Sequence, residues 1–347
     1  MFKQNNICCI SDIHLGVHQN SSQWHNISID WARWLSKELK NKGIKDIFIS
    51  GDFFHYRSEI AVNTLHVANK ILNIWKDFNI IMIIGNHDSF YKDRIDINSL
   101  CLLDNFTNIT IIDKPTTIKK FTRKIQFCPW ATSLSEMEEC DIMFGHFEIE
   151  SFKLNHTKIC SFGLRTGELL KLSDMIITGH FHTRELREYK KGKILYLGNP
   201  YQMDFGDTGN QKGYYILDIS NKKVDFYANK ISPEHKKITL SSLIEYKKIS
   251  PKVKKLFNNN IIKFIIDMKI SSDDIELLFS KLSELTPHTL LTDYAINFDR
   301  FGLDDSETSK ISGVDIPTAI DDFIELLDID NKKQVLEKTL QLYKNCK

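Results

Sequence analysis

The sequence predicts an α/β fold, a sandwich of mixed sheets flanked by helices, to which a small α/β module and C-terminal helices are attached. Two observations predict it. Five short, β-branched apolar runs are continuous rather than alternating, which is typical of strands buried on both faces. Helical stripes separate the first three runs, so the chain begins β-α-β-α-β and its sheet starts mainly parallel. The five runs span residues 7–10, 47–49, 80–84, 142–144 and 175–177.

Two helices are expected between the first three runs. Residues 23–40 place apolar side chains at helical spacing, and Gly43 follows as a stop signal. Ser58 is a candidate N-cap for the second helix, whose inward stripe runs to Trp75. These helices are expected to flank a largely parallel sheet.

Further along the chain the pattern changes to short strands. Residues 107–130 carry few helix signals, and residues 192–227 predict a strand meander. Polar clusters at strand ends stop near Ser232-Pro233, after which a strand, a helix and a strand predict a small α/β module. These three elements are expected at residues 261–270, 272–285 and 289–298.

Two amphipathic helices are expected at the C-terminal end. One apolar stripe runs from Ile316 to Leu327, and the next from Leu336 to Tyr343. A polar stretch rich in Asp, Ser and Gly precedes them and suits a linker. The stripes therefore either fold back on the body of the protein or dock on a partner.

The chain has 347 residues, and its composition predicts a cytoplasmic protein. Its seven Cys form an odd set without a Cys-x-x-Cys pair, which favours reduced core thiols. An apolar leader and a membrane-length apolar run are both lacking, so secretion and membrane insertion are not expected. The net charge of +1 neither demands nor excludes a polyanionic partner, and the local basic stretches are either solvated surface or contacts to nucleic acid.

Each of the five buried runs ends in Asp, Asn or His. Because sites in layered α/β folds form beyond the carboxyl ends of strands, these side chains are expected to meet in one place. Hydrolysis of a phosphate ester requires charge neutralisation and a strong nucleophile, which two divalent cations roughly 3.5–4 Å apart supply. Mixed imidazole, amide and carboxylate ligands favour Mn²⁺, Fe²⁺ or Zn²⁺ over Mg²⁺ or Ca²⁺. The clusters are Asp12-Ile13-His14, Gly51-Asp52, Gly85-Asn86-His87-Asp88, Gly145-His146 and Gly179-His180-Phe181-His182.

Each cluster alone has an ordinary explanation. Gly51-Asp52 and Gly85-Asn86 could form turns, and His146 could be a core histidine with satisfied hydrogen bonds. It is their joint occurrence, in order and each at the end of an apolar run, that favours a two-metal enzyme.

The ordered motifs resemble the calcineurin-like metallophosphoesterase superfamily. Within it, Gly51-Asp52-Phe53-Phe54-His55 and the run Gly198-Asn199-Pro200-Tyr201-Gln202 resemble the SbcD-type double-strand-break repair nucleases. The short chain is most similar to the bacteriophage recombination endonuclease subunits of that group. The likeness covers residues 12–214 and becomes purely architectural beyond residue 235.

The resemblance implies a role for each residue of the site. Asp12, His14, Asp52 and His182 would hold one ion, and Asp52, Asn86, His146 and His180 the other, with Asp52 bridging. His87 would act on the scissile phosphate or protonate the leaving oxygen, and Asp88 would orient it. His55 would help place the DNA end, and the aromatic rings near it could receive an unstacked base.

The resemblance also implies an organisation and a function. Residues 1–235 would form the metallophosphoesterase nuclease domain, residues 236–300 a capping module, residues 301–314 a linker and residues 315–347 partner-docking helices. The expected enzyme is a manganese-dependent 3′-to-5′ exonuclease and single-strand endonuclease acting on DNA double-strand ends in repair and recombination. Its expected partners are an SMC-like, SbcC-type ATPase and a second copy of the chain. Two rivals remain: a phosphodiesterase or phosphatase for small substrates, and an architectural subunit that dimerises and docks the ATPase.

Overall fold

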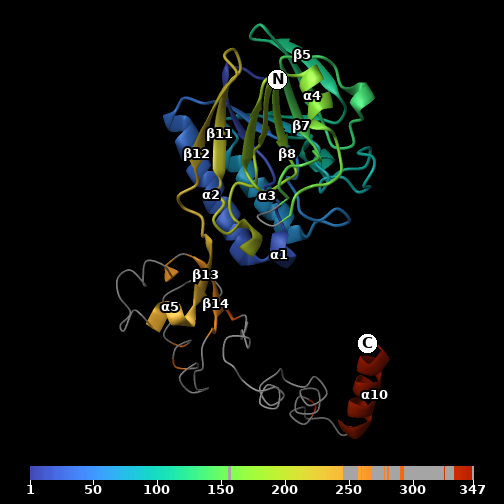
Figure 1. Cartoon of the computed structure of the whole chain (residues 1–347), viewed down its shortest axis with the longest axis vertical. Coiled ribbons are helices and arrows are strands. Elements are labelled where there is room, and N and C mark those ends of the chain that lie inside the picture. Colours follow the sequence, from blue (N-terminus) through green and yellow to red (C-terminus); the bar gives the residue numbers. More distant parts are fainter. Residues whose placement is uncertain are drawn as a thin grey trace.

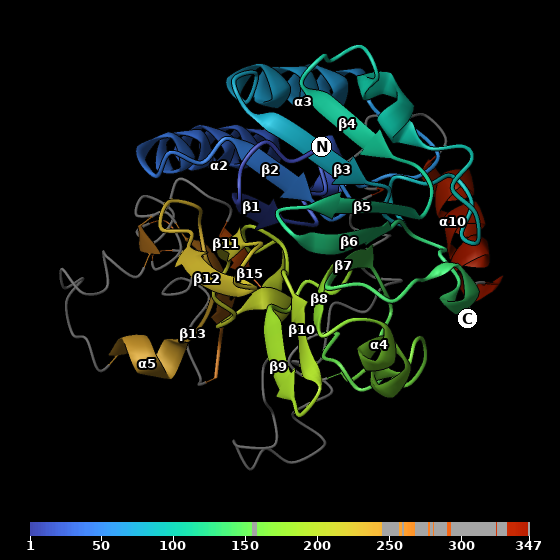
Figure 2. The same ribbon diagram turned by 90° about the horizontal axis from the view of Figure 1, so that it is seen from above.

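The computed structural model describes residues 1–154, 158–244, 257–258, 260–267, 277, 280, 290–292, 324 and 332–345. It contains two six-stranded mixed sheets, which confirms the predicted fold class (Figures 1 and 2). The first sheet consists, in spatial order, of β12 (Lys223–Ala228), β11 (Gly213–Asp218), β1 (Asn6–Ile10), β2 (Asp46–Ile49), β3 (Asn79–Ile83) and β4 (Ile109–Ile112). The second consists of β5 (Thr116–Lys120), β6 (Arg123–Cys128), β7 (Ile142–His146), β8 (Met175–Gly179), β10 (Gly192–Tyr196) and β9 (Glu185–Tyr189).

The two sheets pack face to face through aromatic side chains. The rings of Phe48 on β2 and Phe144 on β7 have centroids 4.3 Å apart, and Phe127 on β6 stacks on Phe144. β1 to β4 run parallel to one another, as do β6, β7, β8 and β10. The strands that precede the polar clusters are buried on both faces, as their continuous apolar runs predicted.

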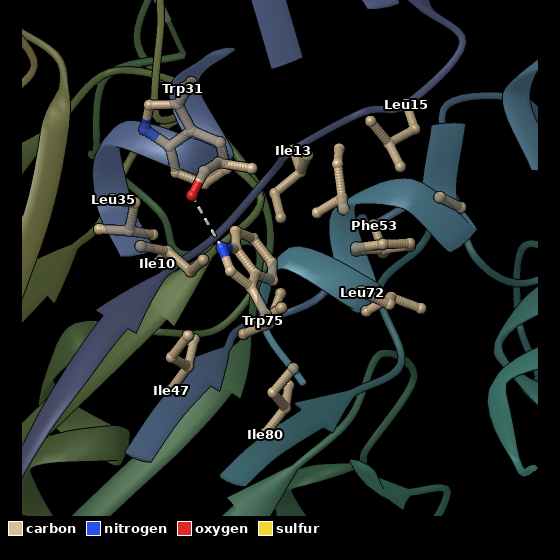
Figure 3. Packing of buried hydrophobic residues seen from close by; sticks show 14 of the residues in the cluster. Ile10, Ile13, Leu15, Trp31, Leu35, Ile47, Phe53, Leu72, Trp75 and Ile80 are labelled. Carbon is tan, nitrogen blue, oxygen red and sulfur yellow. Dashed lines mark hydrogen bonds between the residues drawn. The ribbon is translucent and has the colours of Figure 1, made fainter. Parts of the chain in front are cut away.

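Helices α2 (Ser22–Asn41) and α3 (Val62–Ile74) cover the outer face of the first sheet (Figure 2). Their apolar stripes pack with the strands into one core, in which Trp31 and Trp75 are fully buried (Figure 3). The indole N–H of Trp75 donates a 3.0 Å hydrogen bond to the carbonyl of Ala32, which joins the two helical segments. On the far side, α4 (Thr166–Leu172) and neighbouring loops cover the second sheet through Leu169.

Shorter helices complete this part of the chain. They are α1 (Val17–Asn20) and the 3-10 helices η1 (Ser99–Leu103), η2 (Leu134–Glu136) and η3 (Phe205–Asp207).

Two local expectations were wrong. Ser58 does not cap the second helix, because the chain is still extended at Ala61 and the helix begins at Val62. Residues 192–227 do not form one meander, because β10 pairs with β8 and β9 in the second sheet whereas β11 and β12 belong to the first. Alternation of side chains identifies strands but does not say which sheet they join.

A third, parallel sheet follows, with strands β13 (His235–Thr239), β14 (Ile261–Ile265) and β15 (Leu290–Thr292), and α5 (Leu240–Ile244) next to it. The last helix, α10 (Lys332–Asn345), lies apart from the large sheets in Figure 1. The linker at 301–314 lies outside the described residues, as do most of the helix expected at 272–285 and most of the stripe from Ile316 to Leu327. Within the described parts of the chain, none of the helices has the length and apolar character to cross a bilayer.

Candidate metal centre

The polar residues after β1, β2, β3, β7 and β8 converge where the two sheets meet. Four of them adopt positive φ angles although they are not glycine: Asp12 (54°), His14 (50°), Asp52 (55°) and His180 (92°). Such conformations cost of the order of 1–3 kcal/mol each and persist only where the surroundings impose them, typically at functional sites. The chain therefore uses strained turns to point these side chains at one another.

Asp12, His14 and His182 form the first group of ligand-type side chains. Their ligand atoms lie within 4.8 Å of one another. His14 Nε2 is 3.0 Å from His182 Nε2 and 3.9 Å from Asp12 Oδ1. All three are among the residues that the resemblance assigns to one ion, and they lie on the segments that follow β1 and β8.

Asp52, His146 and His180 form the second group, again within 4.8 Å. His146 Nε2 lies 3.3 Å from Asp52 Oδ2. Asn86 Oδ1 lies 2.9 Å from His146 Nε2 and 2.6 Å from His180 Nδ1, so the amide joins this group. Asp52 Oδ2 is also 3.5 Å from His14 Nε2, which places Asp52 between the two groups.

Neighbouring groups fix the orientation of the imidazoles. His146 Nδ1 lies 2.6 Å from the carbonyl oxygen of Ser50, so Nδ1 donates there and Nε2 is the nitrogen that faces Asp52. His180 Nε2 lies 3.2 Å from Glu148 Oε1, which leaves Nδ1 facing Asn86. Metal-ligating histidines have this kind of support in proteins.

The charges in the site suit cations. Burial lowers the pKa of His14 and brings that of His182 to about 4, so both rings are neutral and offer lone pairs. Burial opposes the charge on Asp52, but the positively charged His146 outweighs it and holds the pKa of Asp52 well below its usual range. The donor set of two carboxylates, four imidazoles and one amide therefore fits two divalent ions of the Mn²⁺, Fe²⁺ or Zn²⁺ type.

His87 and His55 lie beside the first group. His55 Nδ1 is 3.2 Å from His14 Nδ1, and the rings of His55 and His87 are stacked at 5.4 Å. His87 Nδ1 lies 2.6 Å from the carbonyl oxygen of His55, and its backbone N–H donates to Asp52 Oδ1 at 2.7 Å. His55 is thus placed to orient both His14 and His87.

The expectation that Asp88 orients His87 was wrong. Asp88 Oδ1 accepts hydrogen bonds from the backbone N–H groups of Phe53 and Phe54, and Oδ2 accepts one from Gly85. The carboxylate is fully buried and fixes the loop after β2 against the loop after β3. The carbonyl of His55 holds the His87 ring in its place.

The expectation of base-stacking rings next to His55 was wrong for two of the aromatic residues. Phe53 and Phe54 are 0% exposed and belong to the core under α2 and α3. Since both rings are enclosed by apolar side chains, neither can receive a base.

Two features of the site escaped the sequence. Arg57 reaches Asn86: with the amide oxygen turned toward it, the guanidinium Nη2 is 2.8 Å away. Lys212 donates to the carbonyl oxygen of His182 and to Asp207 Oδ1, both at 2.6 Å, and the ion pair is buried. An Arg two residues after His55 was a usable signal, whereas the Lys212–Asp207 pair becomes visible only in the fold.

Comparisons with known proteins agree with this geometry. The profile described as calcineurin-like phosphoesterase matches residues 6–184, just over half of the chain. Exonuclease subunit 1 of Enterobacteria phage T4 is 29% identical over 231 residues, which are 63% of this chain and 66% of that protein. The SbcD polypeptide of nuclease SbcCD is 24% identical over 254 residues in Staphylococcus epidermidis, covering 62% of this chain and 66% of that protein. Its counterpart in Staphylococcus saprophyticus is 24% identical over 256 residues, covering 62% and 65%.

The chain thus spans about two thirds of the length of the curated relatives it matches. The matched profile begins at β1 and ends just beyond His182, so it contains all seven ligand-type residues that converge in the site. By its profile, its two-sheet fold and this site, the chain belongs to the calcineurin-like phosphoesterase family.

Proposed function

We propose that this chain is a metal-dependent DNA nuclease that hydrolyses phosphodiester bonds at double-strand ends, with 3′-to-5′ exonuclease and single-strand endonuclease activity. The convergence of the seven ligand-type side chains beside His87 carries the proposal. The names of the relatives, an exonuclease subunit and two nuclease subunits, favour DNA over a small substrate.

The side chains divide the work between holding ions and handling protons. Asp12, His14, Asp52 and His182 would hold one ion, and Asp52, Asn86, His146 and His180 the second. Two bound cations, Mn²⁺ in this proposal, would supply charge neutralisation at the phosphoryl oxygens and a nucleophile at neutral pH.

His87 is the proposed general acid. Its Nδ1 donates to the carbonyl of His55, so in the imidazolium form Nε2 carries the second proton, which it can give to the leaving oxygen. His55 holds this ring in place and supports His14 from the opposite side.

Arg57 supplies the contact to the substrate phosphate in this proposal. Among the residues that the structure describes, its buried Nη1 has no hydrogen-bond partner. If Asn86 turns its oxygen toward His146 and His180, as a ligand would, Arg57 also loses the acceptor at Nη2. A buried guanidinium nitrogen without an acceptor is costly, and a phosphate oxygen satisfies it with a charge-assisted hydrogen bond.

The proposed nuclease would work in an assembly. The two staphylococcal relatives are named as parts of a nuclease called SbcCD, and we propose an SMC-like ATPase subunit and a second copy of this chain as partners. A partner that clamps DNA would explain how a chain of net charge +1 acts on a polyanion.

Degradation of an end-labelled linear duplex by the purified chain tests the proposal. Activity is expected with Mn²⁺ and not with EDTA, and Asp52→Asn should abolish it. His66→Ala, which alters an exposed histidine on α3, should behave as wild type. Turnover of methyl para-nitrophenyl phosphate with no action on DNA would indicate the small-substrate rival, and inactivity on both despite bound metal would indicate the architectural one.

A further inference from the structure

A cavity opens beside the second ligand group. Its volume is about 340 Å³, and His146, Phe147 and Glu148 are among the residues that line it. Trp130 also lines it, at the turn that follows β6, and its ring meets that of His146 edge-on with centroids 6.1 Å apart. Small-ligand sites occupy roughly 300–1,000 Å³, so the cavity is large enough for part of a substrate.

Trp130 is held as a fixed aromatic surface at this cavity. Its indole N–H donates to the carbonyl of Lys92 at 2.7 Å, and its backbone N–H donates to the carbonyl of Ile84 at 2.8 Å. The ring is tilted by 30° over His180, with centroids 5.1 Å apart. The ring therefore cannot turn freely, and it lies directly against a residue of the second ligand group.

Core packing accounts fully for Trp31 and Trp75 but only in part for Trp130. Trp31 and Trp75 are 0% exposed in the main core, whereas Trp130 is half-buried. Its one polar side-chain atom is already hydrogen-bonded, so the part of the ring that lines the cavity is apolar. Fixed aromatic faces near a phosphate site are what proteins use to stack unpaired bases.

We propose that the cavity is a nucleobase subsite in which Trp130 stacks on the unpaired base of a nucleotide next to the scissile phosphate. This inference rests on the proposed nuclease function and assigns one wall of its substrate site. Trp130 would thus take the base-stacking role that was expected of the rings near His55, of which Phe53 and Phe54 are enclosed in the core. Because every base has a ring face, such a subsite tolerates any sequence but requires the base to leave the duplex.

Calorimetric titration of the Mn²⁺-loaded chain with thymidine monophosphate and with deoxyribose phosphate tests the subsite. Both ligands carry the phosphate and sugar, and only the first carries a base. The wild-type protein should bind the nucleotide more tightly. Trp130→Ala should weaken nucleotide binding by about 5- to 150-fold, the range expected for loss of one stacked base, and should change sugar-phosphate binding less than twofold.

Two further variants make the result specific. Trp130→Phe should keep most of the preference, since a ring face remains. Trp34→Ala removes another half-buried tryptophan, which packs against Tyr214 away from the site, and should keep the full preference. Equal weakening of both ligands by Trp130→Ala would mean a structural role and would overturn the subsite.

The nuclease proposal and the subsite fail in different ways. If the wild-type chain degrades duplex DNA but binds both ligands equally, the subsite is overturned and the nuclease function stands. If it prefers the nucleotide through Trp130 but cuts no DNA, the subsite is supported and the proposed reaction is wrong.

Discussion

His87 is the residue whose proposed role is easiest to separate from metal binding. Its Nδ1 faces the carbonyl of His55, while its ring lies 4.7 Å from that of His14, with which His55 and His87 form a third group of ligand-type nitrogens. If His87 is the general acid rather than a ligand, His87→Asn should leave about two ions per chain. Loss of a general acid lowers activity by about 10²- to 10⁴-fold, and the duplex assay should show a decrease in that range. His66→Asn is the matched control and should change neither quantity. Loss of metal by His87→Asn would instead make His87 a ligand.

Metal binding should release protons, and its strength should rise with pH. Burial opposes protonation of His146, but the Asp52 carboxylate outweighs burial and raises the pKa of His146 to about 9. Burial also raises the pKa of Asp12 to about 7. Since ligands must be deprotonated, the proton on His146 competes with the ion at neutral pH, and protonation of Asp12 adds to this below pH 7.

The Mn²⁺ affinity is therefore expected to increase between pH 6 and pH 8. Titration calorimetry in two buffers with different ionisation enthalpies counts the protons released. The same affinity at both pH values, with no proton release, would contradict the charge states described for the site.

The buried Lys212–Asp207 pair should contribute to stability and to the placement of His182. Burial opposes the charge on Asp207, but Lys212 outweighs it and lowers the pKa of Asp207. Lys212→Met would leave the buried Asp207 carboxylate without its cation and remove the shorter of two hydrogen bonds to the His182 carbonyl, and breaking such a pair costs about 3–5 kcal/mol. Urea unfolding should show this loss, and the metal affinity should decrease as well.

Lys223→Met provides the control for this substitution. Lys223 pairs with Asp225 at 3.0 Å, but both side chains are exposed to solvent. Exposed pairs contribute about 0–1 kcal/mol, so little change is expected. Comparable losses of unfolding free energy in the two variants would mean that the buried Lys212–Asp207 pair stabilises the fold no more than an exposed pair does.

At the residue scale, the sequence predicted which side chains would converge but not how they support one another. The ligand-type residues were found because each follows an apolar run, a pattern that local sequence carries. The contacts of Asp88 with Phe53 and of Lys212 with His182 join segments far apart in the chain. No spacing rule predicts such contacts, because they depend on how the loops pack.

Among the elements, the end of β8 should tolerate added volume poorly. A Cβ at Gly179 would overlap Ser11 Oγ and lie 2.5 Å from the carbonyl oxygen of Ser50, where the second sheet meets the loops of the first. Gly179→Ala should therefore lower the free energy of unfolding by about 1–3 kcal/mol and weaken metal binding. Gly167→Ala in α4 has nothing within 4 Å and should not destabilise. Equal free energies of unfolding for the two variants would show that the backbone around Gly179 can move apart to accept a methyl group without loss of stability.

The elements were predicted best where burial is strong. Helix α2 begins and ends within one residue of the expected 23–40, because its apolar stripe packs along its whole length. β9 was missed because it is an edge strand of largely exposed, mostly charged residues that pairs only with β10. The sheet to which β10 belongs could not be predicted, since that choice depends on long-range pairing rather than on local pattern.

At the scale of the molecule, the boundary expected near residue 235 remains a prediction. The third sheet begins at His235, whose backbone N–H donates to Gln202 Oε1 at 2.6 Å and whose ring stacks on Trp24. These contacts tie β13 to helix α2 and to the loop between β10 and β11, so a capping module would not be an independent body at this point. The predicted boundary thus marks the point where a new sheet begins and the polar clusters at strand ends stop. It does not mark a gap in the contacts between side chains.

Removal of α10 distinguishes the two possibilities that its sequence left open. The helix lies apart from the large sheets in Figure 1, and Val335, Leu336 and Leu340 remain only half-buried. A chain ending at residue 331 should therefore keep its melting temperature and its Mn²⁺-dependent hydrolysis of methyl para-nitrophenyl phosphate. It should lose co-purification with the proposed SMC-like ATPase subunit, because a half-buried stripe on a separate helix is suited to a groove in a partner. A decrease of several degrees in melting temperature, with partner binding retained, would instead mean that α10 packs on its own chain.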